Sequence, residues 1–262
     1  MNFFKRIINA IIFQKAKLLN AYENIKYRKY LVKIEDPKLI FDIGYNLGNY
    51  SKEILKLFPQ AKIIGIEANV NLINSSFSNK NITKINYLVS NSKDKYHNFY
   101  INREFLGMST ASEKFISDSR FALGSKKLDI TENFYEKVQV PVISIEKLIN
   151  TYGVPNLTKI DVEGYEFEVI KSINKYSNKI TFEWHEEFYE DLENIIIHLM
   201  KIGYTKFGVI GYFTEKTNNK ILKSNKGDPF SIEPPYYKWE ELELKNYINK
   251  DRRIHYGMVW AK

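Results

Sequence analysis

The sequence contains no cysteine, and its 262 residues include only seven prolines and twelve glycines. Without a thiol the chain has no disulfide, no thiolate metal ligand and no cysteine nucleophile. It also lacks a long apolar run. The uncharged stretch at residues 7–13 is too short to cross a bilayer, and no small-residue cleavage site follows it. With 44% hydrophobic and 27% charged residues, the composition predicts a folded protein. The absence of cysteine permits a reducing compartment, and we expect a cytoplasmic location.

Positive charge is concentrated at the N-terminus. Residues 1–40 hold nine Lys and Arg against three Asp and Glu, a surplus of six within a net charge of +8. The pattern predicts a basic amphipathic helical extension over residues 1–38. Such a helix either docks on its own domain or lies on an anionic membrane surface, the latter through residues 1–20. The rest of the chain carries little net charge, so we do not expect nucleic acid as a partner.

From Leu39 onward, short apolar runs alternate with amphipathic segments, which predicts an α/β domain over residues 39–262. The expected strands are 39–44, 62–68, 85–90, 157–162, 179–184, 206–210 and 256–261. The expected helices are 47–58, 70–79, 145–152, 165–174 and 188–202. No clear helix separates the last two strands, so an antiparallel ending is expected.

Two segments interrupt this alternation, and we interpret them as insertions near residues 91–137 and 211–250. The first is polar and rich in serine and lysine. It is either a surface loop or a lid over a site, and the sequence leaves both alternatives open. The second is long enough to predict a functional segment.

A glycine-containing turn follows the first expected strand. Gly44 and Gly48 let the backbone turn sharply and approach a ligand closely, and Asn46 lies between them. The dinucleotide-binding fingerprint requires further glycines that this turn lacks, so a pyrophosphate site is poorly supported. The turn therefore predicts a cofactor other than a dinucleotide.

Two acidic residues lie at the carboxyl ends of the first two expected strands. Asp42 can receive an ammonium group, such as that of S-adenosylmethionine, directly or through water. Glu67, 25 residues later, can accept hydrogen bonds from two ribose hydroxyls. Ala68 and Ser90 complete the cofactor-binding candidates, and the hydroxyl of Ser90 can contact an adenine edge.

Later strand ends carry the candidate catalytic groups. Asp161 and Glu163 follow a buried strand just before a helix, and His185 ends the next strand. Asp161 and His185 are the candidate general bases, and Asp161 can instead hold the amino-acid end of the cofactor. Asp161, Glu163, Glu183, His185 and Glu186 offer metal ligands. No zinc-type histidine spacing accompanies them, and we expect no metal.

Four segments together resemble the FkbM family of S-adenosylmethionine-dependent methyltransferases. They are Phe-Asp-Ile-Gly-Tyr-Asn-Leu-Gly (41–48), Ile-Glu-Ala-Asn (66–69), Val-x-Ser-Ile-Glu-Lys-Leu-Ile (142–149) and Lys-Ile-Asp-Val-Glu-Gly-Tyr-Glu (159–166). This resemblance implies a class I, Rossmann-like methyltransferase fold, with a mostly parallel seven-stranded sheet, an antiparallel last strand and helices on both faces. It also implies S-adenosylmethionine as cofactor and O-methylation of sugars, glycans or secondary metabolites.

The chain departs from the family pattern at Tyr45, where alanine is usual, at Ala68, where proline is usual, and at Ile145-Glu146, where the family has Leu-Asp. Our hypothesis is an O-methyltransferase for a hydroxyl-bearing acceptor, most simply a carbohydrate. One alternative is a methyltransferase for RNA ribose 2'-hydroxyls. Another is a non-catalytic scaffold that binds the cofactor or a membrane surface.

Overall fold

The computed structural model describes residues 37–103, 105–119, 135–174, 179–215, 230–237 and 252–262. The predicted basic extension lies outside these residues, apart from its last two positions. So do residues 120–134, 216–229 and 238–251 of the predicted insertions. Within the described part, no helix has the length and apolar character needed to span a membrane.

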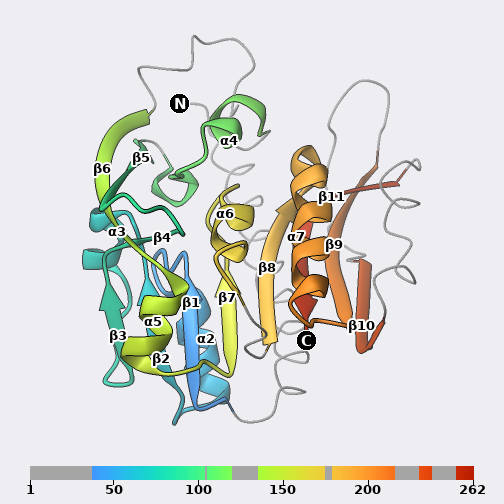
Figure 1. Cartoon of the computed structure of the whole chain (residues 1–262), viewed down its shortest axis with the longest axis horizontal. Helices are drawn as coiled ribbons and strands as arrows, with labels where there is room; N and C mark the ends of the chain where they lie inside the picture. The colour runs from blue at the N-terminus through green and yellow to red at the C-terminus, as the bar shows by residue number, and fades with distance from the viewer. Residues whose placement is uncertain (1–36, 104, 120–134, 175–178, 216–229, 238–251) are drawn as a thin grey trace, which may run out of the picture. The chain divides into compact units, whose positions relative to one another are not determined.

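Among the described residues, the main sheet has eight strands, five of which are mutually parallel (Figure 1). Their order is β10 (Phe230–Tyr237), β9 (Phe207–Glu215), β11 (Arg252–Ala261), β8 (Lys179–His185), β7 (Leu157–Ile160), β1 (Leu39–Ile43), β2 (Lys62–Ile66) and β3 (Ile82–Ile85). The last strand, β11, runs antiparallel to both β8 and β9. This order confirms the predicted class I methyltransferase fold, and β10 extends its seven strands at one edge.

Helices cover both faces of this sheet (Figure 1). The helices of the domain are α2 (Asn49–Leu57), α3 (Val70–Ser75), α4 (Glu113–Asp118), α5 (Ile145–Tyr152), α6 (Glu166–Ile170) and α7 (Tyr189–Lys201). In the view of Figure 1, α5, α6 and α7 lie in front of the sheet and α2 lies behind it.

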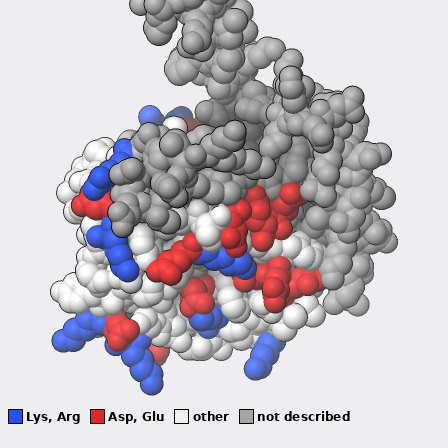
Figure 2. All heavy atoms as spheres, turned by 90° about the horizontal axis from the view of Figure 1, so that it is seen from above, with Lys and Arg blue, Asp and Glu red and all other residues white. Residues whose placement is uncertain are grey.

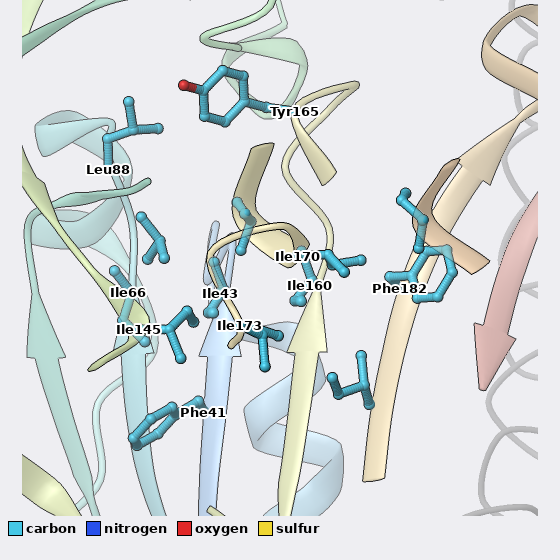
Figure 3. Close-up of a cluster of buried hydrophobic side chains, with 14 of the residues drawn as sticks. Phe41, Ile43, Ile66, Leu88, Ile145, Ile160, Tyr165, Ile170, Ile173 and Phe182 are labelled. Atoms are coloured by element: carbon cyan, nitrogen blue, oxygen red, sulfur yellow. The ribbon is translucent and has the colours of Figure 1, made fainter. Parts of the chain in front are cut away.

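Side-chain alternation along the central strands explains the two layers. Phe41 and Ile43 of β1 face the core beneath α5 and α6, where Ile160 and Phe182 join them (Figure 3). Each of these side chains is at most 1% exposed, and complete burial of one contributes about 1.5–3 kcal/mol. Asp42, between the two β1 residues, points to the opposite face and meets Ser51 of α2.

The third strand differs from the prediction. A single strand was expected at residues 85–90. Instead, β3 ends at Ile85, and β4 (Leu88–Val89) pairs with β6 (Tyr135–Ile143) in a second sheet of order β4-β6-β5, where β5 is Tyr96–Asn102. The side-chain amide of Asn86 explains the break, because it donates to the carbonyl oxygens of Glu67 and Ala68. The chain therefore leaves the main sheet after β3.

The described half of the first predicted insertion packs on the carboxyl edge of the main sheet. It contains β5, the short 3-10 turn η1 (Leu106–Met108) and α4. Phe115 of α4 is fully buried, and the hydroxyl of Thr110 donates to the carbonyl oxygen of Glu163 at 2.7 Å. This segment is thus anchored to the loop that follows β7. Of the second predicted insertion, the structure describes the end of β9 and all of β10.

Candidate functional site

The turn after β1 is held between two neighbouring strands. The amides of Gly44 and Tyr45 both donate to the carbonyl oxygen of Ile66 at 3.0 Å. Gly44, Asn46 and Gly48 all have positive φ angles, of 76°, 50° and 77°. A Cβ on Gly44 would lie 1.7 Å from the carbonyl oxygen of Asp161, so position 44 requires glycine on both steric and conformational grounds.

Tyr45, the departure from the family pattern, lies below this turn. It is 2% exposed, and its hydroxyl donates to the carbonyl oxygen of Phe77 at 2.7 Å. A Cβ on Gly48 or on Gly65 would overlap the tyrosine ring. The two glycines therefore make room for the ring, which supports the turn from inside.

Glu67 is fixed at the end of β2 by backbone amides. Its Oε2 accepts from the amide of Asn46 and its Oε1 from the amide of Asn69, both at 2.8 Å. Burial raises the pKa of Glu67, and these two hydrogen bonds partly oppose the increase. A carboxylate offers about four acceptor positions, so positions remain for two hydroxyl donors. The residue therefore fits the ribose of S-adenosylmethionine.

The other predicted cofactor-binding residues lie close to this turn with different exposure. Asp42 is fully buried, accepts from the Ser51 hydroxyl at 2.6 Å and lies 3.4 Å from Nζ of Lys159. Burial raises its pKa, and Lys159 opposes the increase. Ala68 and Ser90 are 8% and 3% exposed. The Ser90 hydroxyl accepts from the amide of Ser92 and lies 3.4 Å from the hydroxyl of Tyr165.

The predicted catalytic residues lie together with Glu163 and Glu183 at the ends of β7 and β8. The side chain of Asp161 is 34% exposed, whereas that of His185 is only 3% exposed. Nε2 of His185 lies 3.2 Å from Oε2 of Glu183. The rings of Phe115 and Phe188 pack edge-on against the imidazole, with centroids 5.8 and 6.0 Å away. Asp161 thus reaches solvent at this edge, and His185 lies beneath it.

Burial shapes the electrostatics of this group. It raises the pKa of Glu163 well above the ordinary value, and the neighbouring Glu183 and Asp161 raise it further. Burial and then Asp161 raise the pKa of Glu183. Burial alone would lower the pKa of His185, but Glu183, Glu166 and Glu187 together outweigh that effect and raise it. Glu183 and His185 therefore form a hydrogen-bonded acid–base pair at this edge.

Lys159 is the main residue of the site that the sequence interpretation missed. Its side chain is 6% exposed, and its Nζ lies 3.2 Å from Oδ2 of Asp161. Burial alone would lower its pKa, but the carboxylates of Asp161 and Asp42 raise it above the ordinary value. The sequence held part of the signal, because residues 159 and 161 are two apart in the predicted strand 157–162, although β7 itself ends at Ile160.

Two overlapping sets of side chains have ligand atoms within 4.8 Å of one another, as a metal site would require. They are Glu163, Glu183 and His185, and Asp161, Glu166 and Glu183. The expectation that no metal is used stays a prediction. Figure 2, which looks onto this edge, shows acidic side chains gathered near its middle.

A small hollow opens between α6, β8 and α7. Its lining includes Glu183 and His185 together with the aromatic side chains of Phe167, Trp184 and Phe188.

Comparison with known proteins identifies the family of the chain. Residues 42–206 match the sequence model of the methyltransferase FkbM domain. No curated protein gives a significant match. Similar solved structures include a SAM-dependent methyltransferase from Archaeoglobus fulgidus (12% identity, 92% of this chain and 93% of that chain, TM-score 0.44). They also include precorrin-6y C5,15-methyltransferase from Geobacter metallireducens GS-15 (12% identity, 88% of this chain and 82% of that chain, TM-score 0.42). A third is methyltransferase FkbM from Methylobacillus flagellatus KT (13% identity, 66% of this chain and 40% of that chain, TM-score 0.41).

The family match spans well over half of the chain and contains the glycine turn, Glu67, Asp161 and His185. The chain therefore belongs to the FkbM methyltransferase family, whose methyl donor is S-adenosylmethionine.

Proposed function

We propose that this protein transfers a methyl group to a hydroxyl oxygen, and that its acceptor is a carbohydrate. The observation that supports this most directly is the position of proton acceptors beside the donor turn. Asp161 contacts Lys159, which also bonds the turn at Gly44. The hydrogen-bonded Glu183 and His185 lie on the next strand. An alcohol needs a base at this place, whereas a neutral amine or an activated carbon is already a nucleophile.

The reaction breaks the bond between sulfur and methyl carbon and forms one between that carbon and the acceptor oxygen. The hydroxyl proton passes to a base, a step that contributes about 10²- to 10⁴-fold. Positioning contributes more, because the reacting atoms must lie about 3–3.5 Å apart and in line. Asp161 is one candidate base, and because it reaches solvent, we assign it to direct contact with the bound ligands. His185, which is buried beside Glu183, is the other candidate base.

RNA ribose is a less suitable acceptor at this edge. The partly exposed carboxylate of Asp161 would repel a phosphate backbone, and Lys159, the cation that contacts Asp161, is itself buried. Nucleic-acid binding usually depends on many exposed Lys and Arg side chains. Neutral, hydroxyl-rich acceptors suit the site better.

The test incubates the purified chain with methyl-labelled S-adenosylmethionine and three acceptor pools: neutral oligosaccharides, RNA and peptides. We expect base-stable label on carbohydrate oxygen. Label on RNA, on nitrogen or on carbon would refute the proposed acceptor class, and absence of donor binding would refute the function itself.

The catalytic assignment is tested on the acceptor so found. We expect Asp161→Ala or His185→Ala to lower turnover by at least about 10²-fold. His198→Ala is the matched control, because that histidine, on α7, bonds the carbonyl oxygen of Ile173, which follows α6. If both site variants keep full turnover, the assignment is wrong.

A further inference from the structure

Lys159 is a buried cation that joins the parts of the site. In the sheet it pairs with Asp42 of β1 on one side and with Thr181 of β8 on the other. Its side chain extends toward the carboxyl edge and is 6% exposed. A lysine is almost never so buried unless it is paired, so its contacts show what it is used for.

Each of the three N–H bonds of the ammonium has an oxygen nearby. Nζ donates to the carbonyl oxygen of Gly44 at 2.9 Å, and it lies 3.4 Å from Oδ1 of Asp42 and 3.2 Å from Oδ2 of Asp161. It also lies 5.8 Å from the centre of the Tyr50 ring. A single side chain thus contacts the donor turn, the start of the α2 layer and the exposed carboxylate of the site.

We propose that Lys159 is the positioning residue of the donor site, which it serves by holding the Gly44 turn and the Asp161 carboxylate in one fixed geometry. This inference rests on the proposed function, because it assumes that the donor binds at this turn. Lys159 does not touch the donor in this account. It acts through Gly44 and Asp161, while its contact with Asp42 neutralises a carboxylate that has no exposed surface.

The experiment must separate positioning from stability, because removing a partner from a buried ion pair destabilises the fold. Asp42→Asn is therefore the reference background. It removes the buried charge and keeps an oxygen for the Ser51 hydroxyl. Asp42→Asn/Lys159→Met then differs from the reference only at the lysine, without an unpaired buried carboxylate at position 42.

The readouts are thermal unfolding and calorimetric binding of S-adenosylhomocysteine. We expect both forms to unfold cooperatively, and the double variant to bind the ligand at least about tenfold more weakly than the reference. Equal affinity in the two folded forms would overturn the proposal. The same measurement on the wild-type chain distinguishes the two claims. A wild type that does not bind the ligand would refute the proposed function, whereas a wild type that binds it leaves only the role of Lys159 in question.

Lys84→Met is the matched control. Lys84 also contacts three oxygens at 2.9–3.3 Å: the carbonyl oxygens of Ile73 and Ser76 and the hydroxyl of Ser76. These atoms, however, lie at the end of α3. We expect this variant to lose stability and to keep its donor affinity within about twofold. A loss of affinity as large as that of the Lys159 variant would show that any lysine with several oxygen contacts has this effect, and would overturn the specific role.

A second measurement avoids substitution at the site. In the wild type, the NMR signal of the Lys159 ammonium nitrogen should shift on saturation with S-adenosylhomocysteine, while that of Lys84 should not. An unchanged Lys159 signal at saturation would overturn the proposal even if the double variant fails to fold.

Discussion

Glu67 shows how one side chain links the donor to the fold. Both of its oxygens accept a backbone amide, from Asn46 in the glycine turn and from Asn69 at the start of α3. Its orientation is therefore fixed before any ligand arrives, and its remaining acceptor positions suit two hydroxyls.

We predict that Glu67→Gln weakens binding of S-adenosylhomocysteine at least about tenfold and lowers the melting temperature. An amide has one oxygen, so its NH₂ group must face a backbone amide and leave that donor unpaired, at a cost of about 1–3 kcal/mol. Calorimetry and thermal unfolding measure the two effects. Glu146→Gln, at an exposed position on α5, is the control. Wild-type affinity in a folded Glu67→Gln variant would contradict the role given to this residue.

Glu166 makes a pH-dependent contribution to stability. It is 6% exposed, its Oε1 accepts from the amide of Val162 at 2.9 Å, and burial raises its pKa from 4.5 to about 7. At pH values between 4.5 and about 7, Glu166 therefore keeps its proton in the folded state but has lost it in the unfolded state. The contribution of Glu166 to stability therefore falls as pH rises through this window and levels off above it.

We predict that Glu166→Gln is more stable than the wild type at pH 8, by up to about 3 kcal/mol, and that the difference disappears toward pH 4. The substituted amide oxygen can still accept from Val162. Urea unfolding at several pH values measures this difference. Parallel stability curves for the two proteins would contradict the buried, protonated state of Glu166.

At the residue scale, the sequence allowed several site positions to be predicted. Asp161, Glu67 and His185 follow apolar strand runs, and parallel strands bring their carboxyl ends to one edge. Exposure was not predictable, because it depends on packing from distant segments. His185 is buried by Phe115 and Phe188, and Asp42 is covered by α2. Lys159 was missed because its partners come from β1 and from the loop after β7.

The glycine turn is the element on which the donor site depends. Gly44 and Gly153 both have positive φ angles, of 76° and 98°, but their surroundings differ. A Cβ on Gly44 would lie 1.7 Å from a backbone oxygen, whereas the nearest neighbour of one on Gly153 is the Leu39 side chain at 3.7 Å. The pair therefore separates steric overlap from conformational strain.

We predict that Gly44→Ala prevents folding or costs more than about 4 kcal/mol, because the strands on both sides of the turn would have to move. Gly153→Ala should cost only about 1–3 kcal/mol, the cost of its positive-φ, extended backbone conformation, which is nearly restricted to glycine. Expression level and urea unfolding compare the two variants. Equal losses would show that the close contact with β7 does not constrain the turn.

Elements with a strong apolar period were predictable, and those defined by side-chain contacts were not. Strands β1, β2, β7 and β8 begin at their predicted residues, and α5 matches its predicted range. The third strand was misplaced because Asn86 bonds the end of β2 and turns the chain away. The edge strand β10 was not expected, since its segment contains two prolines and lies in a predicted insertion.

Charge distribution is a property of the whole molecule, and the basic N-terminal segment lies outside the described residues. Its sequence leads to a prediction about membranes. A helix that lies on the membrane surface predicts that the full chain is recovered with anionic vesicles in flotation and that the variant lacking residues 1–20 is recovered far less, because charge and apolar area act together. A helix that docks on its own domain predicts equal recovery of both forms. Neutral vesicles are the control. Equal recovery of both forms would remove membrane contact from the account.

The central claim is that the turn at Gly44–Gly48, Glu67 and Asp161 together hold the methyl donor. A crystal structure of the full chain with S-adenosylhomocysteine tests this most directly. We predict that the ribose hydroxyls lie within hydrogen-bond distance of the Glu67 carboxylate, and that the sulfur lies on the side of Asp161. Ligand bound at another place, or no ligand at saturating concentration, would contradict the account.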